Sequence, residues 1–322
     1  MAKQPEDYSK VHRLDLVHEI VTDPATGDKR LALRPDPRRY RVVEIKEERF
    51  LHDTLDDFLM PISGAISLIE CAVQETPIGS GPSLGDARIY VASRLAEVQN
   101  RLRADHIQPY HHIDRSDEFL ASLPDGAHGF AMISVDLVGS TRLSETLDVI
   151  TNARVIGVVL EEIAAVVPYF DAHILKFTGD GVILYVPPPS FNIANDEAID
   201  CALTIRRLIH DAINPSFVES GYPTIDVRIG IESGAAVAMT VGHASSKQHR
   251  DLIGKTINMA CKIQATGNPG EIRIGQIAYQ NMHTMWKLGC EPINLPLEWE
   301  YRFRDERPYP IHLFARDGAV VE

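Results

Sequence analysis

Positive charge, cysteine pairs and long apolar runs are all scarce in this sequence. Its 322 residues include 45 acidic and 32 basic side chains, giving a formal net charge of −13. A general nucleic-acid binder needs a basic face, so nucleic acid is not an expected partner. The cysteines Cys71, Cys201, Cys261 and Cys290 form no CxxC pair, which argues against a zinc site and a disulfide framework.

Membrane and export signals are also missing from the pattern. The longest apolar stretch outside the expected strands, 58–73, contains Pro61 and Glu70 and is too short to span a bilayer. The polar N-terminus has no apolar core of the kind that secretory signals carry. We therefore expect a cytoplasmic protein with reduced thiols and no membrane contact, and we interpret 58–73 as a buried amphipathic helix.

Two unequal domains are predicted from the length and from a change of pattern near residue 127. Residues 1–126 form a charged region that we expect to be mainly helical, with one strand at 40–45, helices near 51–59 and 89–98, and a Gly/Pro/Ser-rich loop at 76–85. A polar linker is expected at 105–128. Its histidines His106, His111 and His112 suit a solvated linker better than a metal site, because no cysteine or carboxylate pair accompanies them.

Residues 127–322 alternate between strand and helix patterns. We expect strands at 131–138, 173–177, 182–186, 224–232, 235–242, 271–275 and 309–315, with helices at 140–168, 195–213 and 256–266. The segment between the second and third strands, Thr178 to Gly181, is typical of a β-hairpin. The predicted fold class is α+β, a mostly antiparallel sheet flanked by helices and preceded by the mainly helical N-terminal region.

Two carboxylates stand out in this second region. Asp136 ends an apolar strand and Asp180 lies at the hairpin tip, so neighbouring strands would bring both to one edge of the sheet. Paired carboxylates suit Mg²⁺ or Mn²⁺, with substrate phosphates completing the coordination. Taken singly, Asp136 could cap the next helix and Asp180 could be a turn residue; their combination with glycine-rich surroundings favours metal binding.

A phosphate site is predicted directly after Asp136. Leu137 is followed by Val138, Gly139, Ser140 and Thr141, which lead into a helix whose N-terminal amides could bind phosphate, with Ser140 or Thr141 as its N-cap. The IGKT at 253–256 is not a P-loop, because His249 occupies the position of the required first glycine.

Four segments together resemble the class III nucleotidyl cyclase family. They are FAMISVDLVGSTRL, ILKFTGDGVILYV, VRIGIESG and DLIGKTINMACKIQ, in the family's order, within residues 127–316. The resemblance implies a class III cyclase-type fold and a lyase that converts a nucleoside triphosphate to a 3′,5′-cyclic mononucleotide and pyrophosphate. It implies that two divalent ions, Mg²⁺ or Mn²⁺, are held by Asp136, Leu137 and Asp180.

The same resemblance assigns the substrate contacts. Lys176 and Asp251 take the base-reading positions, Asn258 orients the ribose, and Lys262 stands where the family usually has the arginine that contacts phosphates in the transition state. Lysine keeps the charge of that arginine but loses its bidentate geometry. The alignment also offers Lys247 or Arg250 for the terminal phosphates. In this family, metal carboxylates and base-reading residues come from different catalytic domains, so a homodimer with two equivalent sites is implied.

The choice of base stays open at this stage. Lys176 and Asp251 offer one donor and one acceptor, which fit adenine, cytosine or uracil; guanylate cyclases usually carry an acid at the lysine position. Lys262 and the absence of a recognisable sensor module resemble the Pycsar pyrimidine cyclases of bacterial anti-phage defence, which implies UTP or CTP as substrate and a separate effector that reads the product. An adenylate cyclase is the alternative, and an inactive nucleotide-binding domain a third. The N-terminal region could be a dimerisation element, a sensor or a cap.

Overall fold

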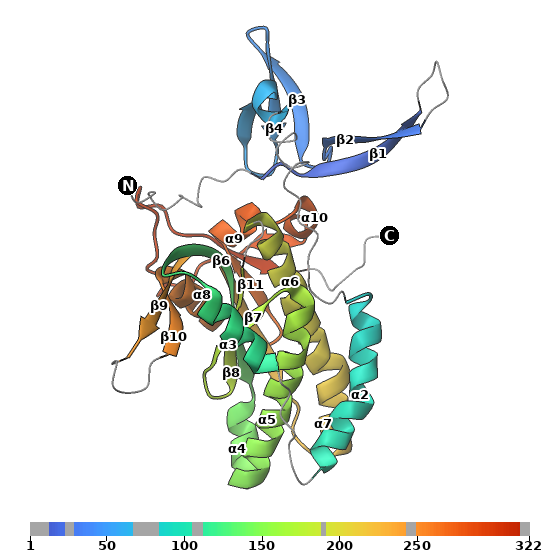
Figure 1. Ribbon diagram of the computed structural model, residues 1–322, viewed down its shortest axis with the longest axis vertical. Helices are drawn as coiled ribbons and strands as arrows, with labels where there is room; N and C mark the ends of the chain where they lie inside the picture. Colours follow the sequence, from blue (N-terminus) through green and yellow to red (C-terminus); the bar gives the residue numbers. More distant parts are fainter. Residues whose placement is uncertain are drawn as a thin grey trace.

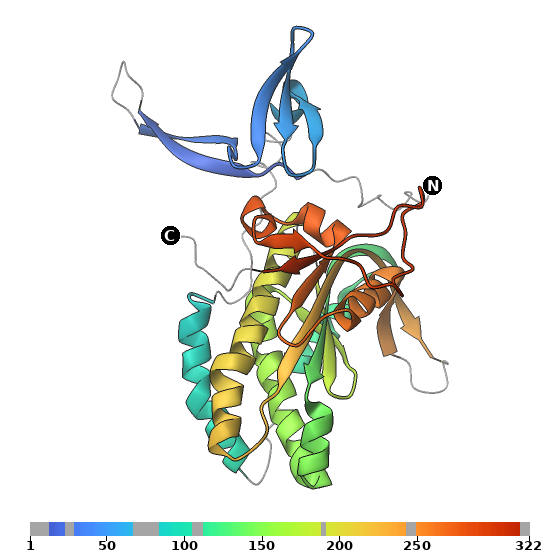
Figure 2. The same cartoon turned by 180° about the vertical axis from the view of Figure 1, so that it is seen from behind.

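The computed structural model describes residues 13–22, 29–66, 84–104, 112–187, 191–242 and 249–315. It consists of a central sheet with helices on both faces and a smaller set of N-terminal strands at one end (Figures 1 and 2). Among the described residues, no helix is long and apolar enough to cross a membrane.

The central sheet has eight strands in the order β12-β13-β11-β9-β6-β8-β7, with β10 pairing to β9 off this path. Every pairing is antiparallel except β11 with β9, which confirms the predicted mostly antiparallel sheet. The strands are β6 (Gly126–Val138), β7 (His173–Phe177), β8 (Gly181–Val186), β9 (Asp226–Val241), β10 (His249–Ile253), β11 (Ile272–Gly275), β12 (Cys290–Pro292) and β13 (Ile311–Phe314).

The strand alternation divides the core between the two faces of the sheet. On β6, Ile133 and Val135 belong to a large apolar cluster with the helices α2 (Ala87–Arg103), α5 (Val149–Val166) and α6 (Phe191–Leu208). Their neighbours Phe130 and Met132 point the other way, into a second cluster with α3 (His112–Ser122) and α8 (Lys255–Ala265). Asp136, an even-numbered residue of β6, is therefore on the α8 face.

The remaining elements complete this helical cover. They are α4 (Ser140–Thr146), the 3₁₀ helix η2 (Val167–Phe170), the π-helix η3 (Ile209–Ile213), α7 (Asn214–Glu219), α9 (Gln276–Asn281) and α10 (Thr284–Lys287). Glu232 on β9 is fully buried beneath α9, where it accepts hydrogen bonds from the Tyr309 hydroxyl (2.6 Å) and the Ala278 amide (3.2 Å). Burial raises the pKa of the Glu232 carboxyl to about 7, against the lowering effect of these hydrogen bonds.

The N-terminal region corrects part of our prediction. The strand predicted at 40–45 is β3 (Tyr40–Ile45), and the helix predicted around 89–98 is α2. The helix predicted at 51–59 is wrong, because these residues lie in β4 (Glu48–Asp53) and β5 (Phe58–Pro61), which pair antiparallel with each other and continue the sheet of β3. Leu51 pairs with Met60 and both are buried, so a two-residue repeat was misinterpreted as a helical one.

Two further N-terminal strands, β1 (Leu16–Thr22) and β2 (Lys29–Pro35), form a ribbon that the sequence did not predict. The buried helix expected over 58–73 is β5 followed by helical residues 62–66; its remainder, and residues 76–83 of the expected loop, lie outside the described residues. The expected linker at 105–128 contains α3, whose Phe119 and Leu120 pack in the second cluster. His112 begins this helix, whereas His106 and His111 lie outside the described residues.

Three corrections concern the second region. The helix expected over 140–168 is broken at Leu147, and its N-cap is Gly139 (φ 97°) instead of Ser140 or Thr141. In a continuous helix Ile150 would share an apolar face with Leu143 and Leu147, but it is 82% exposed, because Asp148 starts a new helix there with its own cap. The two strands expected at 224–232 and 235–242 are the single strand β9, which pairs with β6 through Gly234 without interruption.

Candidate functional site

Asp136 lies near the end of β6 and is held by two side chains of the α8 face. The Arg228 guanidinium, directly opposite on β9, forms an ion pair with it, and Gln264 of α8 donates a hydrogen bond to the same carboxylate oxygen (3.3 Å). The Asp136 side chain is 29% exposed, so a ligand can reach it. A carboxylate with an adjacent cation in a half-buried position is suited to bind metal ions and phosphates together.

Asp180 reaches the same edge of the sheet through the hairpin between β7 and β8. In the register of β6 with β8, Asp136 pairs with Gly181, the residue after Asp180. A Cβ atom at Gly181 would lie 2.7 Å from the Val135 carbonyl oxygen, so only glycine permits this close approach. Strand order and this one glycine thus place the hairpin tip that carries Asp180 beside the backbone of Asp136.

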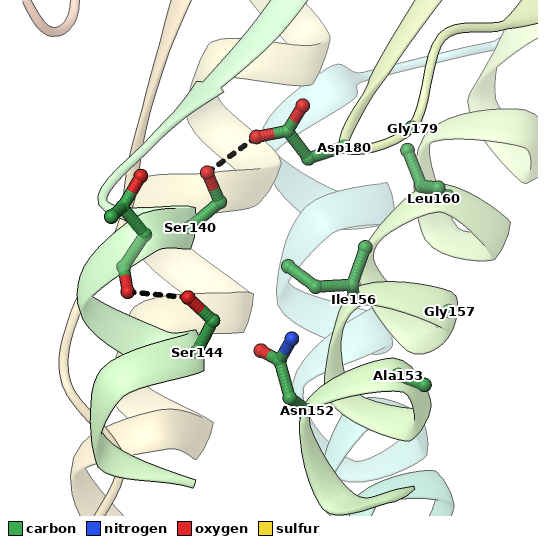
Figure 3. Close-up of a pocket in the computed structure, with 10 residues that line it drawn as sticks. Ser140, Ser144, Asn152, Ala153, Ile156, Gly157, Leu160, Gly179 and Asp180 are labelled. Atoms are coloured by element: carbon green, nitrogen blue, oxygen red, sulfur yellow. Dashed lines mark hydrogen bonds between the residues drawn. The ribbon is translucent and has the colours of Figure 1, made fainter. Parts of the chain in front are cut away.

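A cavity of about 560 Å³ opens beside Asp180, between α4 and α5 (Figure 3). Ser140 and Thr141, two of the predicted phosphate-binding residues, line it together with Asp180, and the Ser140 hydroxyl donates a hydrogen bond to the Asp180 carboxylate. Val138 and Gly139 are not part of this lining. Its other walls come from α4 and α5 and include Ser144, Asn152, Ile156 and Leu160.

The predicted base-reading residues meet within this chain. Lys176 Nζ on β7 lies 3.0 Å from Asp251 Oδ2 on β10, although three strands separate β7 from β10 in the sheet order. Their side chains are 44% and 18% exposed, which leaves the pair open to a ligand. An exposed ion pair contributes little to stability, and this one offers a ligand one donor and one acceptor.

Asn258 and Lys262 lie one helical turn apart on α8, and both are exposed. Gln264 is buried on the same helix, on the side that contacts Asp136. At about 100° per residue, Asn258 and Lys262 share a face that is turned well away from Gln264. The predicted ribose-orienting residue and the predicted phosphate-contacting residue therefore both face away from the Asp136 carboxylate of their own chain.

The residues near Asp136 fit divalent ions only in part. Asp136 and Asp180 supply hard oxygen ligands, and Leu137, whose side chain is buried, could add its backbone carbonyl. In the part of the chain that the structure describes, no group of three or more His, Cys, Asp or Glu side chains could hold an ion by itself. Remaining ligands would be water and substrate phosphates, the arrangement that Mg²⁺ commonly uses.

Two contacts of Asp136 were not foreseen from the sequence. Arg228 could have been identified, because it lies within the predicted strand at 224–232 and its pairing with Asp136 follows from the strand register. Gln264 could not have been identified, because its contact depends on how α8 packs.

The two residues offered for the terminal phosphates have different outcomes. Arg250 forms an ion pair with Asp125 and donates to the Leu123 carbonyl, and Lys247 lies outside the described residues.

The fold, though not the site, can be compared with solved structures. The fold is similar to the adenylyl cyclase CyaB from P. aeruginosa (TM-score 0.51, 20% identity, covering 59% of this chain and 95% of that one). It is also similar to the guanylyl cyclase Cya2 (TM-score 0.50, 17% identity, 60% and 93%). Both likenesses concern the fold alone.

The sequence relatives are matched over only part of their length. A putative adenylate cyclase 3 of Rhizobium meliloti is 26% identical over 153 residues, and an uncharacterized protein of Mycobacterium tuberculosis is 31% identical over 136 residues. These matches include 48% and 41% of this chain but 23% of each relative. Residues 127–293, more than half of the chain, match the family described as the adenylate and guanylate cyclase catalytic domain. The chain belongs to this family of class III nucleotidyl cyclase domains.

Proposed function

We propose that this protein is a homodimeric nucleotidyl cyclase that forms a 3′,5′-cyclic mononucleotide and pyrophosphate from a pyrimidine nucleoside triphosphate. The observation that carries the proposal is the register of β6 with β8, which sets Asp136 beside the hairpin tip that bears Asp180. Two carboxylates on adjacent strands, with Arg228 next to them, suit a substrate that arrives as a metal triphosphate.

The exposed face of α8 supports a site shared between two chains. Asn258 and Lys262 are turned away from their own Asp136, yet their proposed roles require the same substrate. A second copy related by twofold symmetry would supply these two residues, together with Lys176 and Asp251, to the carboxylates of the first. Each dimer would then contain two equivalent sites.

The reaction is an in-line attack of the ribose 3′-oxygen on the α-phosphorus. The new bond joins these two atoms, the bond from the α-phosphorus to the bridging oxygen breaks, and pyrophosphate leaves with that bond's electron pair. When bound by Asp136, Asp180 and the Leu137 carbonyl, two Mg²⁺ or Mn²⁺ ions would favour loss of the hydroxyl proton and neutralise the leaving group.

The protein's own side chains position the substrate for this attack. Asn258 would hold the ribose and Lys262 would neutralise charge on the α-phosphate. Arg228, which pairs with Asp136 here, would be available to the pyrophosphate oxygens once that carboxylate binds cations instead. Ser140 and Thr141 would contact phosphate from the cavity beside Asp180.

A pyrimidine substrate is proposed because Lys262 replaces the usual arginine, a feature that resembles the Pycsar cyclases. The pair of Lys176 and Asp251 fits uracil and cytosine, and it fits adenine as well. We include in the proposal the anti-phage signalling role and the separate effector that this resemblance implies. Adenylate cyclase activity is the second candidate, since relatives named as adenylate cyclases match this chain.

The decisive test is to incubate the purified protein with Mn²⁺ and each of the four ribonucleoside triphosphates and to identify products by mass. Cyclic UMP or cyclic CMP is expected. Cyclic AMP as the main product would contradict the pyrimidine assignment, and no product from any triphosphate would contradict the cyclase proposal.

The shared site has its own test. Asp136→Ala and Asn258→Ala chains should each be inactive alone, and mixing them should restore part of the activity, because one of the two sites in a mixed dimer keeps every residue. Copurification of the untagged variant with an affinity-tagged copy of the other variant verifies that mixed dimers form. A mixture of dimers without activity would contradict the shared site.

A further inference from the structure

Asp251 presents a single carboxylate oxygen to two donors. Its Oδ1 atom is fixed by the amide of Leu252 (2.9 Å), whereas Oδ2 lies 3.0 Å from Lys176 Nζ and 4.0 Å from His249 Nε2. The side chains of Lys176 and His249 are 44% and 67% exposed, and that of Asp251 is 18% exposed. The acceptor Asp251 Oδ2 and two donors, Lys176 on β7 and His249 on β10, are therefore accessible together at the surface.

The strand geometry of β10 sets this arrangement. His249 and Asp251 are two residues apart, so their side chains are on the same face, while Leu252 between Asp251 and Ile253 is buried on the other. Met239, the partner of Asp251 on β9, is 40% exposed on the same face and offers an apolar thioether against which a flat ring could pack.

We propose that His249 is the third base-reading residue and that Lys176, Asp251 and His249 together recognise uracil. This inference rests on the proposed cyclase function and deepens it. Uracil presents O4, N3–H and O2 along one edge, which is acceptor, donor, acceptor. Lys176, Asp251 Oδ2 and His249 present donor, acceptor, donor, provided that Nε2 of His249 carries its hydrogen.

The other bases leave at least one of these groups without a partner. Cytosine presents donor, acceptor, acceptor, so its ring nitrogen would face the Asp251 carboxylate. Guanine presents acceptor, donor, donor, and adenine presents a donor and an acceptor followed by a C–H group. A site built to hydrogen-bond its substrate discriminates strongly against a ligand that leaves its polar groups unpaired.

The first experiment measures kcat/KM with Mn²⁺ for UTP and ATP in the wild type, His249→Leu, His249→Gln and the surface control His210→Leu. Loss of one hydrogen bond in His249→Leu should lower the ratio of the UTP value to the ATP value about tenfold, and His249→Gln, which keeps a donor, should restore part of that ratio. His210→Leu should match the wild type. A preference for ATP in the wild type, or an unchanged UTP to ATP ratio in His249→Leu, would overturn the inference.

A modified substrate tests the contact itself. The sulfur of 2-thiouridine triphosphate is a poorer hydrogen-bond acceptor than O2, so the wild type should lose activity with it relative to UTP, whereas His249→Leu should process the two equally. Equal losses in both proteins would contradict a contact between His249 and O2. If no triphosphate yields a cyclic product, the cyclase proposal fails, and calorimetric titration of the same variants with UTP and ATP then decides the base preference.

Discussion

The catalytic region and the N-terminal strands are stabilised in different ways. The central sheet has apolar clusters on both faces, and its charged site residues lie at the edge, partly exposed. The strands β3 to β5 contribute a small apolar cluster, Tyr40, Leu51, Met60 and Ala65, and they join the catalytic region through buried charges.

Arg39 is at the centre of the buried charges that join the N-terminal strands to the catalytic region. It is 2% exposed and forms ion pairs with Asp15 (2.8 Å), Asp53 (2.6 Å) and Asp56 (2.7 Å). Lys287 of α10, fully buried, binds Asp56 from the catalytic side (2.8 Å). Burial would raise the pKa of Asp15, but Arg13, Thr284 and Arg39 bring it down to about 2.

Charged side chains have two uses in this protein. At the edge of the catalytic sheet, charged groups are available to a ligand and contribute little to stability. Between the N-terminal strands and α10, they are removed from water and fix how the two parts fit together, because a buried pair tolerates few alternative geometries. These contacts fix the N-terminal strands to the catalytic region of the same chain.

The largest effect is expected in the catalytic region. Asp136→Ala or Asp180→Ala should reduce turnover by about 10³-fold or more, because several kcal/mol of charge stabilisation are lost. The free energy of unfolding should change by less than about 1 kcal/mol, since both side chains are partly exposed. Mass-detected product formation and urea unfolding measure the two quantities. Retained activity in both variants would contradict the two-metal assignment.

Breaking the N-terminal interface should instead change stability more than turnover. Arg39→Met leaves Asp15, Asp53 and Asp56 without their shared cation, at a cost of roughly 3–5 kcal/mol. Limited proteolysis should then cleave the N-terminal strands from a catalytic region that still unfolds cooperatively. The exposed Arg41→Met on the same strand is the control. Equal protease resistance in both variants would show that the buried charges do not hold this interface.

A buried carboxyl group within the catalytic region makes the free energy of unfolding depend on pH. Because the pKa of Glu232 is raised to about 7 from 4.5, the folded state binds its proton more tightly than the unfolded state. Wild-type stability relative to Glu232→Gln should therefore fall as pH rises from 4.5 through 7, by roughly 3 kcal/mol in total. Urea unfolding at pH 5 and pH 8 measures it, with the exposed Glu300→Gln as control. A difference independent of pH would contradict the assignment.

The smallest effect is expected on the exposed face of α8. Lys262→Arg should raise turnover by about threefold to tenfold, since a bidentate guanidinium binds phosphate more strongly than an ammonium group. Its free energy of unfolding should match that of the wild type, because Lys262 is exposed. Steady-state kinetics decide the outcome, and a lower turnover would mean that the site is adapted to lysine.

The catalytic region was largely predictable because its apolar patterns are long and regular. The strands β7, β8 and β11 and the helix α8 were predicted within one residue of their observed bounds, and β6 was predicted correctly at its end but begins five residues earlier than expected. Convergence of Asp136 with Asp180 could be predicted because a hairpin beside a strand allows few geometries. The N-terminal strands were less predictable, because short apolar runs such as 51–59 fit a helix and a strand equally well and the interface depends on buried charges.

The sequence by itself determined the family, and it identified Asp136, Asp180, Lys176 and Asp251 as candidate site residues, since each of these depends on residue identity within a local motif. The tertiary structure decided which side chains share a site. It paired Arg228 with Asp136, turned Asn258 and Lys262 away from their own carboxylates, and brought His249 and Lys176 to the same oxygen of Asp251. These contacts join positions far apart in the chain, so they follow from strand order and helix packing, which local sequence does not encode.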